Sequence, residues 1–174
     1  MKRALLNRRW MKWIYLMMLV TGAWVCAEAQ EFTRITIMHN LPVVKGKIND
    51  KDAYFILDTG ASVTLLNNAL AEDFGFAVVQ NEYWENYVVT GLGGKHLIQE
   101  ARNVVVQLGG ERLAFINKAC SLQKISKNFA ADHIKIAGII GSDIMGFLGS
   151  EINFANHYVI FYQRPIEGLL TCKE

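Results

Sequence analysis

Asp58 is the residue best placed to do chemistry, because it opens the segment 58–62, which reads Asp-Thr-Gly-Ala-Ser. The apolar run 54–57 directly precedes it and predicts a buried strand that ends in a small-residue turn. A carboxylate held at such a point can act as a general acid or base. A structural interpretation stays open for this segment alone, because Asp and Ser also favour turns and helix caps.

The sequence lacks the patterns of the other common hydrolase sites. No Gly-x-Ser-x-Gly elbow occurs, and no Cys-x-x-Cys pair. The four histidines, which are scattered without the His-Glu-x-x-His spacing of a zinc site, are His39, His96, His133 and His157. We therefore predict no metal site and no cofactor.

Two further segments accompany Asp58. The segment 88–96 predicts a hairpin whose tip, Gly91-Leu92-Gly93-Gly94, permits positive φ and suits a mobile lid. It is not a dinucleotide fingerprint, because His96 stands where the last glycine of Gly-x-Gly-x-x-Gly is required. Further on, Ile139 and Ile140 precede Gly141, which opens a short helix. Each segment alone is also compatible with an ordinary hairpin or core packing.

The order of these three motifs resembles the retropepsin family of aspartic proteases over residues 41–162. The resemblance implies a mostly β fold, a closed β-barrel of antiparallel hairpins with one or two short helices. It implies that Asp58 is catalytic, that the glycine-rich hairpin is a flap over the substrate, and that the Ile-Ile-Gly element packs beneath the active-site loop. Thr59 and Gly60 complete the active-site triplet. By the same resemblance, the Thr59 hydroxyl ties the two active-site loops together across a dimer, and the Ser62 hydroxyl supports the aspartate. The residues expected to form the flap or to contact the substrate are Ala61, Gly91, Leu92, Gly93, Gly94, Ile139, Ile140 and Gly141.

A single Asp58 implies two chains. Peptide hydrolysis by carboxylates needs one group to accept a proton from water while another donates to the carbonyl oxygen. We therefore predict a symmetric homodimer in which two Asp58 side chains meet. The residues before 41 and the stretch 120–136 have no assured counterpart in the viral enzymes, so how the copies associate is not carried over.

The predicted function is that of an aspartic endopeptidase acting on a polypeptide substrate. A non-catalytic peptide-binding module or envelope interaction protein on the same fold is the alternative, since fold alone does not certify activity. A membrane-tethered peptidase that keeps its leader is a third hypothesis.

Residues 1–29 predict a cleaved secretory signal, because basic residues precede a short apolar run and then Ala27-Glu28-Ala29. Lipid modification at Cys26 is an alternative. The signal holds five of the 18 basic and one of the 16 acidic residues, so 13 basic and 15 acidic residues remain, a net charge of −2. We expect one domain at 30–174, periplasmic or secreted, with no nucleic-acid partner and no stable membrane insertion after cleavage.

The remaining patterns predict the elements that hold these motifs. Val, Ile, Phe and Tyr enrichment with turn residues at the ends predicts strands at 43–48, 53–57, 87–90, 103–108, 113–116 and 157–162, mostly in consecutive antiparallel hairpins. Helices are predicted at 62–74, ending at Gly75, and at 142–147, with Asp143 in a first turn where it favours the helix dipole. Pairing of Cys120 with Cys172 is left open.

Overall fold

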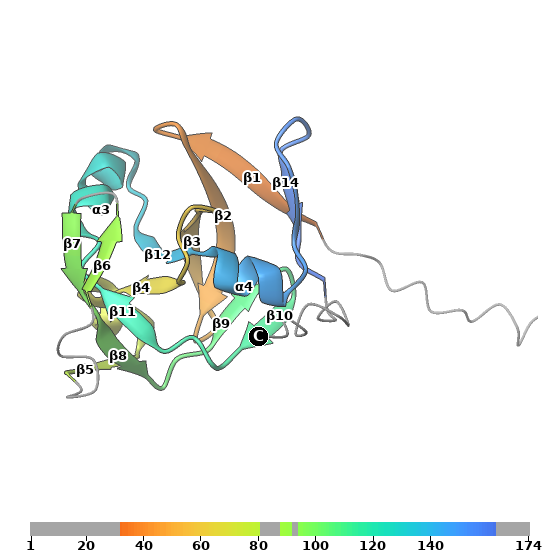
Figure 1. Ribbon diagram of the computed structural model, residues 1–174. Coiled ribbons are helices and arrows are strands. Elements are labelled where there is room, and N and C mark those ends of the chain that lie inside the picture. The colour runs from red at the N-terminus through yellow and green to blue at the C-terminus, as the bar shows by residue number, and fades with distance from the viewer. Residues whose placement is uncertain (1–31, 81–87, 92–93, 163–174) are drawn as a thin grey trace, which may run out of the picture.

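The computed structural model describes residues 32–80, 88–91 and 94–162 of the 174-residue chain. The predicted signal at 1–29, Leu92, Gly93 and Cys172 lie outside these ranges. Twelve of the described strands join one sheet in the order β13-β14-β1-β2-β3-β12-β4-β11-β8-β5, with β9 on β2 and β10 on β9, and β6 pairs with β7 (Figure 1). The strands are β1 (Phe32–Met38), β2 (Leu41–Ile48), β3 (Lys51–Leu57), β4 (Leu65–Asn67), β5 (Ala77–Val79), β6 (Val88–Gly91), β7 (Gly94–Leu97), β8 (Gln99–Arg102), β9 (Val106–Leu108), β10 (Glu111–Leu113), β11 (Lys118–Cys120), β12 (Ile136–Ile140), β13 (Glu151–Asn153) and β14 (Tyr158–Ile160). The helices are η1 (Asn68–Leu70), α2 (Ala71–Phe74), α3 (Gln123–Phe129), η3 (Ala130–Asp132) and α4 (Ser142–Phe147).

The β2–β3 hairpin forms as its turn chemistry predicts. Asn49 and Asp50 adopt φ angles of 48° and 65°, as a two-residue turn with two positive φ values requires. The turn pairs Ile48 with Lys51 and thereby fixes which side chains of β3 point to each face. The register delivers the chain to Asp58 at the end of β3.

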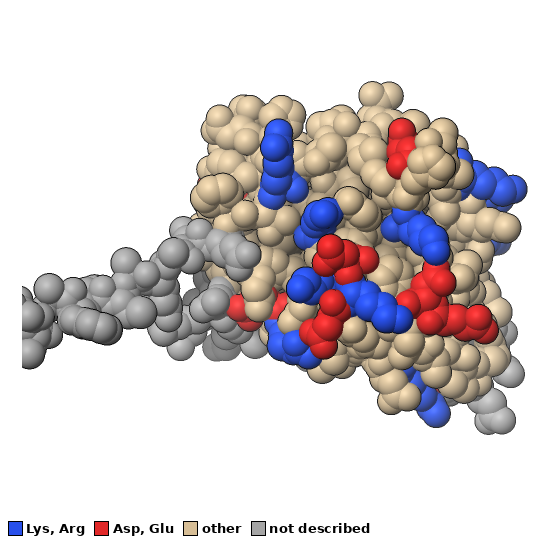
Figure 2. All heavy atoms as spheres, turned by 180° about the vertical axis from the view of Figure 1, so that it is seen from behind, with Lys and Arg blue, Asp and Glu red and all other residues tan. Residues whose placement is uncertain are grey.

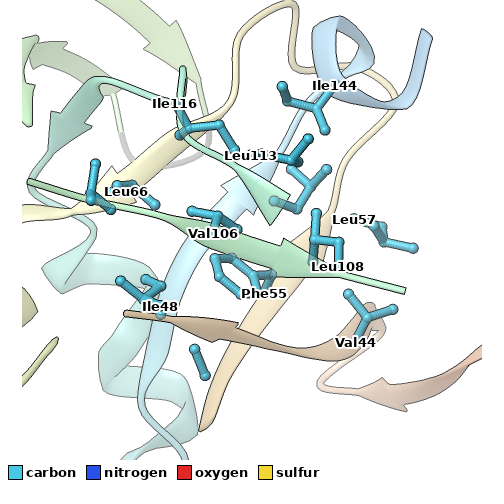
Figure 3. Packing of buried hydrophobic residues seen from close by; sticks show 14 of the residues in the cluster. Val44, Ile48, Phe55, Leu57, Leu66, Val106, Leu108, Leu113, Ile116 and Ile144 are labelled. Carbon is cyan, nitrogen blue, oxygen red and sulfur yellow. The ribbon is translucent and has the colours of Figure 1, made fainter. Parts of the chain in front are cut away.

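Both faces of β3 are covered over residues 53–57, which explains the continuous apolar sequence of this part of the strand. Phe55 and Leu57 pack on one side in a cluster with Val44, while Ile56 packs on the other side with Val43. Phe55 is fully buried at the centre of the first cluster (Figure 3). A strand covered on both sides reads as an apolar run without alternation. Burial of this strand gives the following carboxylate a rigid base.

The strand β12 lies between β3 and β4, the two strands that flank the Asp58 turn. It pairs in parallel with β3 and antiparallel with β4. Its five residues are all buried. Gly138 makes this close packing feasible, because a Cβ there would come within 2.6 Å of the Leu65 carbonyl oxygen and 3.2 Å of the Phe55 ring.

The helix predicted at 62–74 is wrong over its first half. Leu65–Asn67 is strand β4, and helical backbone begins only with η1, followed by the four residues of α2. The stretch is strand because β4 pairs with both β12 and β11, which are remote in sequence. Tertiary hydrogen bonds thus override local helical propensity. The predicted helix at 142–147 is present as α4. Gly75 ends α2, as predicted for the end of the first helix.

Consecutive antiparallel hairpins describe only part of the sheet. β12 with β3 and β11 with β4 are parallel pairs, which join segments remote in sequence. The fold is mostly β with few short helices, as predicted. Strand pairing among the described residues leaves the sheet open, so the predicted closed barrel is not confirmed. The elements that the sequence did not predict are β1, β4, β5, β8, β11, β12, β13, α3 and η3.

Cys120 is a free and fully buried thiol, and Cys172, with which the sequence left a pairing open, lies outside the described residues. Burial raises the pKa of the Cys120 thiol to about 11, because the thiolate would be poorly solvated. Within the described ranges, no helix has the length and apolar character needed to cross a membrane.

The surface charges alternate in sign on the face shown in Figure 2. Lys and Arg side chains lie beside Asp and Glu side chains over that face. Two ion pairs among the described residues join Lys135 to Asp73 at 2.6 Å and Arg112 to Asp50 at 3.1 Å.

Replacement of Gly138 by Ala tests the close packing of β12. We expect Gly138→Ala to lower the free energy of unfolding by about 1–3 kcal/mol, because backbone at Leu65 blocks the new methyl group. Gly146→Ala is the matched control in α4, since no atom lies within 4 Å of its added Cβ, and it should gain about 0.5–1 kcal/mol. Urea unfolding of both variants measures the difference. Equal stabilities would contradict the packing of β12.

Candidate active site

Asp58 is held at the end of β3 by three hydrogen bonds. Its backbone N–H donates to the carbonyl oxygen of Ile140 over 3.0 Å, and its own carbonyl accepts from the N–H of Ala61 over 3.1 Å. The N–H of Gly60 donates to carboxylate oxygen Oδ1 over 2.9 Å. A backbone donor of this kind fixes the orientation of the carboxylate. Among the described residues, Oδ2 makes no hydrogen bond, so this oxygen is available to a further group.

The far end of the turn is held by Thr64, which is 3% exposed. The Thr64 hydroxyl donates to Asp143 Oδ1 over 2.7 Å and accepts from the N–H of Gly141 over 2.9 Å. The Thr64 N–H donates to Asp143 Oδ2 over 2.9 Å. One hydroxyl therefore joins the turn both to the end of β12 and to the first turn of α4.

The middle of the turn contacts the same two elements. The N–H and hydroxyl of Ser142 both donate to the carbonyl oxygen of Ala61, over 2.8 Å and 3.1 Å. Gly141 lies so close to this turn that a Cβ would come within 2.8 Å of the same oxygen. The requirement for Gly141 is thus the close approach of two backbones. α4 lies beside this turn in Figure 1.

The predicted triplet and its neighbours differ in exposure. Asp58 and Ala61 are half-buried, whereas Thr59, Gly60 and Ser62 are exposed. The Ser62 hydroxyl makes no hydrogen bond to Asp58 in the described structure, so its support of the aspartate stays a prediction. The exposed Thr59 is free to contact another chain.

The glycine-tipped hairpin is present as β6 and β7, with Gly91 paired to Gly94. Val89 and His96 are paired on one face and are both half-buried, while the side chains on the opposite face are exposed. Val89 packs against the cluster that includes Ile139 and Ala61. The inner face of the hairpin therefore shares one apolar cluster with the active-site turn. Nε2 of His96 is buried without a hydrogen-bond partner on this face.

Ile139 and Ile140 of β12 pack in two different apolar clusters. Ile139 is 9% exposed and belongs to the cluster under the hairpin. Ile140 is fully buried in the other cluster, beside Phe55. The Ile140 side chain therefore lies on the face of β12 opposite the hairpin. Ile140 supports the Asp58 turn through its backbone carbonyl oxygen. This position makes it a support residue and not a substrate contact.

Sequence reasoning missed Thr64 and assigned Asp143 only a helix-dipole role. Asp143 does lie in the first turn of α4, where it also accepts from the Ile144 N–H over 2.8 Å. Its carboxylate additionally holds Thr64, a contact between residues 79 positions apart. No local pattern signals such a pair. Within the described ranges, no group of three His, Cys, Asp or Glu residues could hold a metal ion.

The fold and this turn define a class of protein that presents one carboxylate, here that of Asp58, at the end of a buried strand. Hydrogen bonds hold the turn that follows, and a glycine-tipped hairpin shares an apolar cluster with it. The model of the aspartyl protease family matches residues 44–144, more than half of the chain. This match includes Asp58, the hairpin and Gly141. The protein belongs to the aspartyl protease family, which confirms the family predicted from the three motifs.

Two solved structures, among 148 matching chains, show what the fold is similar to. The EIAV protease in complex with the inhibitor HBY-793 is 19% identical, with a TM-score of 0.48, over 68% of this chain and 97% of that one. A retropepsin-like aspartic protease from Rickettsia conorii is 16% identical, with a TM-score of 0.44, over 75% of this chain and 88% of that one. No curated protein matches the sequence significantly. Residue roles are therefore argued from the geometry of this chain.

Thr64→Val tests the bracing of the active-site turn. Valine keeps the shape of threonine but leaves the buried N–H of Gly141 without its acceptor, so unfolding free energy should fall by about 1–3 kcal/mol. Thr36→Val, on the exposed side of β1, should change it by less than about 0.5 kcal/mol. Guanidinium unfolding of the two variants makes the comparison. An equal effect at both sites would show that the Thr64 hydroxyl has no special role.

Proposed function

We propose that this protein is an aspartic endopeptidase in which two Asp58 carboxylates of a homodimer activate water for peptide-bond hydrolysis. The observation that carries the proposal is the placement of Asp58, which ends a strand buried on both faces and leads a turn fixed at both ends. A merely structural turn residue would not need its carboxylate left half-exposed with one oxygen unengaged. The family match over residues 44–144 supports the same function.

The proposed chemistry divides between two carboxylates. One takes a proton from the attacking water, and the other donates a proton to the carbonyl oxygen of the scissile bond. Two carboxylates about 3 Å apart do not both ionise, so a facing pair holds one proton between them and supplies both roles at once. One chain offers one such group, and a two-fold axis beside Asp58 supplies the other.

The backbone of this chain supports an assignment for the two oxygens of Asp58. Gly60 N–H occupies Oδ1 of Asp58, so Oδ2 is the oxygen that we assign to the water and to the partner carboxylate. Thr59 is exposed next to it, and we assign its hydroxyl a contact with the turn of the second copy. Fixed donors of this kind cost no reorganisation when the reaction occurs.

The β6–β7 hairpin is assigned the role of a flap over an extended polypeptide. Its inner face packs against the cluster that includes Ile139 and Ala61, which places the hairpin on the same side of the sheet as these residues. Closure of such a hairpin excludes water from the reacting groups. Lys95 and His96 give the strand after the tip a polar character that suits contact with polar groups of a peptide.

We further propose that residues 1–29 are removed as the chain is exported to the periplasm or secreted, with the basic n-region and apolar run as support. The intact mass of the exported protein should correspond to a chain that begins near Gln30. A mass that retains residues 1–29 would instead indicate a tethered protein, and a lipid adduct on Cys26 would indicate lipid modification.

Asp58→Asn tests the assignment of the catalytic group. The amide cannot exchange a proton in the same way, so turnover of an unstructured protein substrate by the purified protein should fall by at least about 10²–10⁴-fold. Asp52→Asn is the control, because Asp52 is an exposed carboxylate on the same hairpin, and it should keep wild-type turnover. Cleavage is followed by mass spectrometry across acidic to neutral pH.

Wild-type turnover in Asp58→Asn would overturn the proposal. Absence of turnover in every form, together with tight peptide binding by the wild-type protein, would favour a non-catalytic peptide-binding module.

A further inference from the structure

His96 on β7 carries a buried polar atom that the fold itself does not use. Its ring nitrogen Nε2 is one of two buried side-chain polar atoms that make no hydrogen bond among the described residues. Buried polar groups in folded proteins nearly always have a partner, because a group removed from water without one costs free energy. The partner of this nitrogen is therefore to be sought outside the described chain.

The hairpin places His96 on the face where an apolar side chain is expected. Val89 and His96 are paired and half-buried on the inner face, and Val89 packs against the cluster that includes Ile139. The outer face instead carries the apolar pair Val88 and Leu97, which are 47% and 46% exposed. Successive residues of a strand point to opposite faces, so the reverse order of His96 and Leu97 would put the imidazole in water and the leucine against the cluster. The observed order departs from the pattern that favours folding, which is typical of a functional position.

The inner face of the hairpin also faces the active-site turn. The cluster that Val89 joins includes Ala61, which belongs to that turn. In the proposed function this hairpin covers an extended polypeptide, so a substrate side chain that passes beneath it meets His96. Strands recognise the backbone of an extended peptide through their own backbone groups, whereas side chains between them supply specificity. Nε2 donates to oxygen both in one neutral tautomer and in the charged ring, so an acceptor oxygen is the partner that suits it.

We propose that His96 selects a substrate residue whose side chain ends in an acceptor oxygen, as glutamine and glutamate do, at the position under the β6–β7 hairpin. This inference rests on the proposed function and names a substrate class for it. A site built to hydrogen-bond a substrate group rejects an analogue that lacks the group, because the buried nitrogen is then left without a partner. The apolar surroundings at Val89 and Ile139 suit the methylene stem of such a side chain.

His96→Leu is the test variant, and Leu97→His is its matched control. The first replaces the inner imidazole by an apolar group, and the second adds an imidazole on the exposed outer face. Unstructured peptides that differ at each position around the cleavage site are digested together at one pH, and mass spectrometry gives their relative kcat/KM. In the wild-type protein we expect glutamine or glutamate to exceed methionine by about 10-fold at one position. The preference should be lost in His96→Leu and kept in Leu97→His.

Thermal unfolding provides a second measurement on the same variants. Leucine at position 96 leaves no buried nitrogen without a partner, so the melting temperature of His96→Leu should be at least that of the wild-type protein. A lower melting temperature would show that the imidazole stabilises the fold itself and would overturn the inference.

The outcomes separate the specificity from the proposed function. Turnover that depends on Asp58 but has the same preference in wild type and His96→Leu overturns the inference and leaves the peptidase intact. Absence of turnover in every form counts against the peptidase, and fluorescence anisotropy of the glutamine and methionine peptides with the wild-type protein then decides the inference. Tighter binding of the glutamine peptide that is lost in His96→Leu supports it, and equal or absent binding overturns it.

Discussion

The structure depends on the insertion of β12 between β3 and β4. These two strands flank the Asp58 turn, so the turn has to pass across the end of β12. The crossing brings the backbone of Gly141 and Ile140 within hydrogen-bond distance of both ends of the turn. The loop that carries the candidate catalytic group is thus held by a buried strand and not only by hydrogen bonds within the loop itself. Such support keeps a reacting group within a narrow range of positions.

This arrangement also explains the composition of the centre of the chain. β12 and residues 53–57 of β3 are covered on both faces, so each is a continuous apolar run. At the carboxyl ends of these strands, backbone groups and the Thr64 hydroxyl replace apolar contacts, and Asp58 carries the charge that follows β3. The separation of apolar support from polar function follows from the cost of burying a charge without a partner.

One chain supplies a well-braced turn that carries one carboxylate. The bracing is internal, since Thr64 and Asp143 hold the turn within the same chain. The proposed reaction needs a second carboxylate as well, which one chain does not supply. In the proposed homodimer, an isologous contact would bring it from a second copy.

The sequence by itself determined the family, the catalytic candidate and the local elements with strong turn chemistry. The β2–β3 hairpin, the glycine-tipped hairpin and the α4 helix follow from short-range patterns at Asn49-Asp50, at Gly91 to Gly94 and at Gly141. Only the tertiary structure decided that 65–67 is a strand, that β12 lies parallel to β3, and that Thr64 meets Asp143. These features depend on hydrogen bonds between segments far apart in the chain, whose energies outweigh local propensity but leave no periodic trace in the sequence.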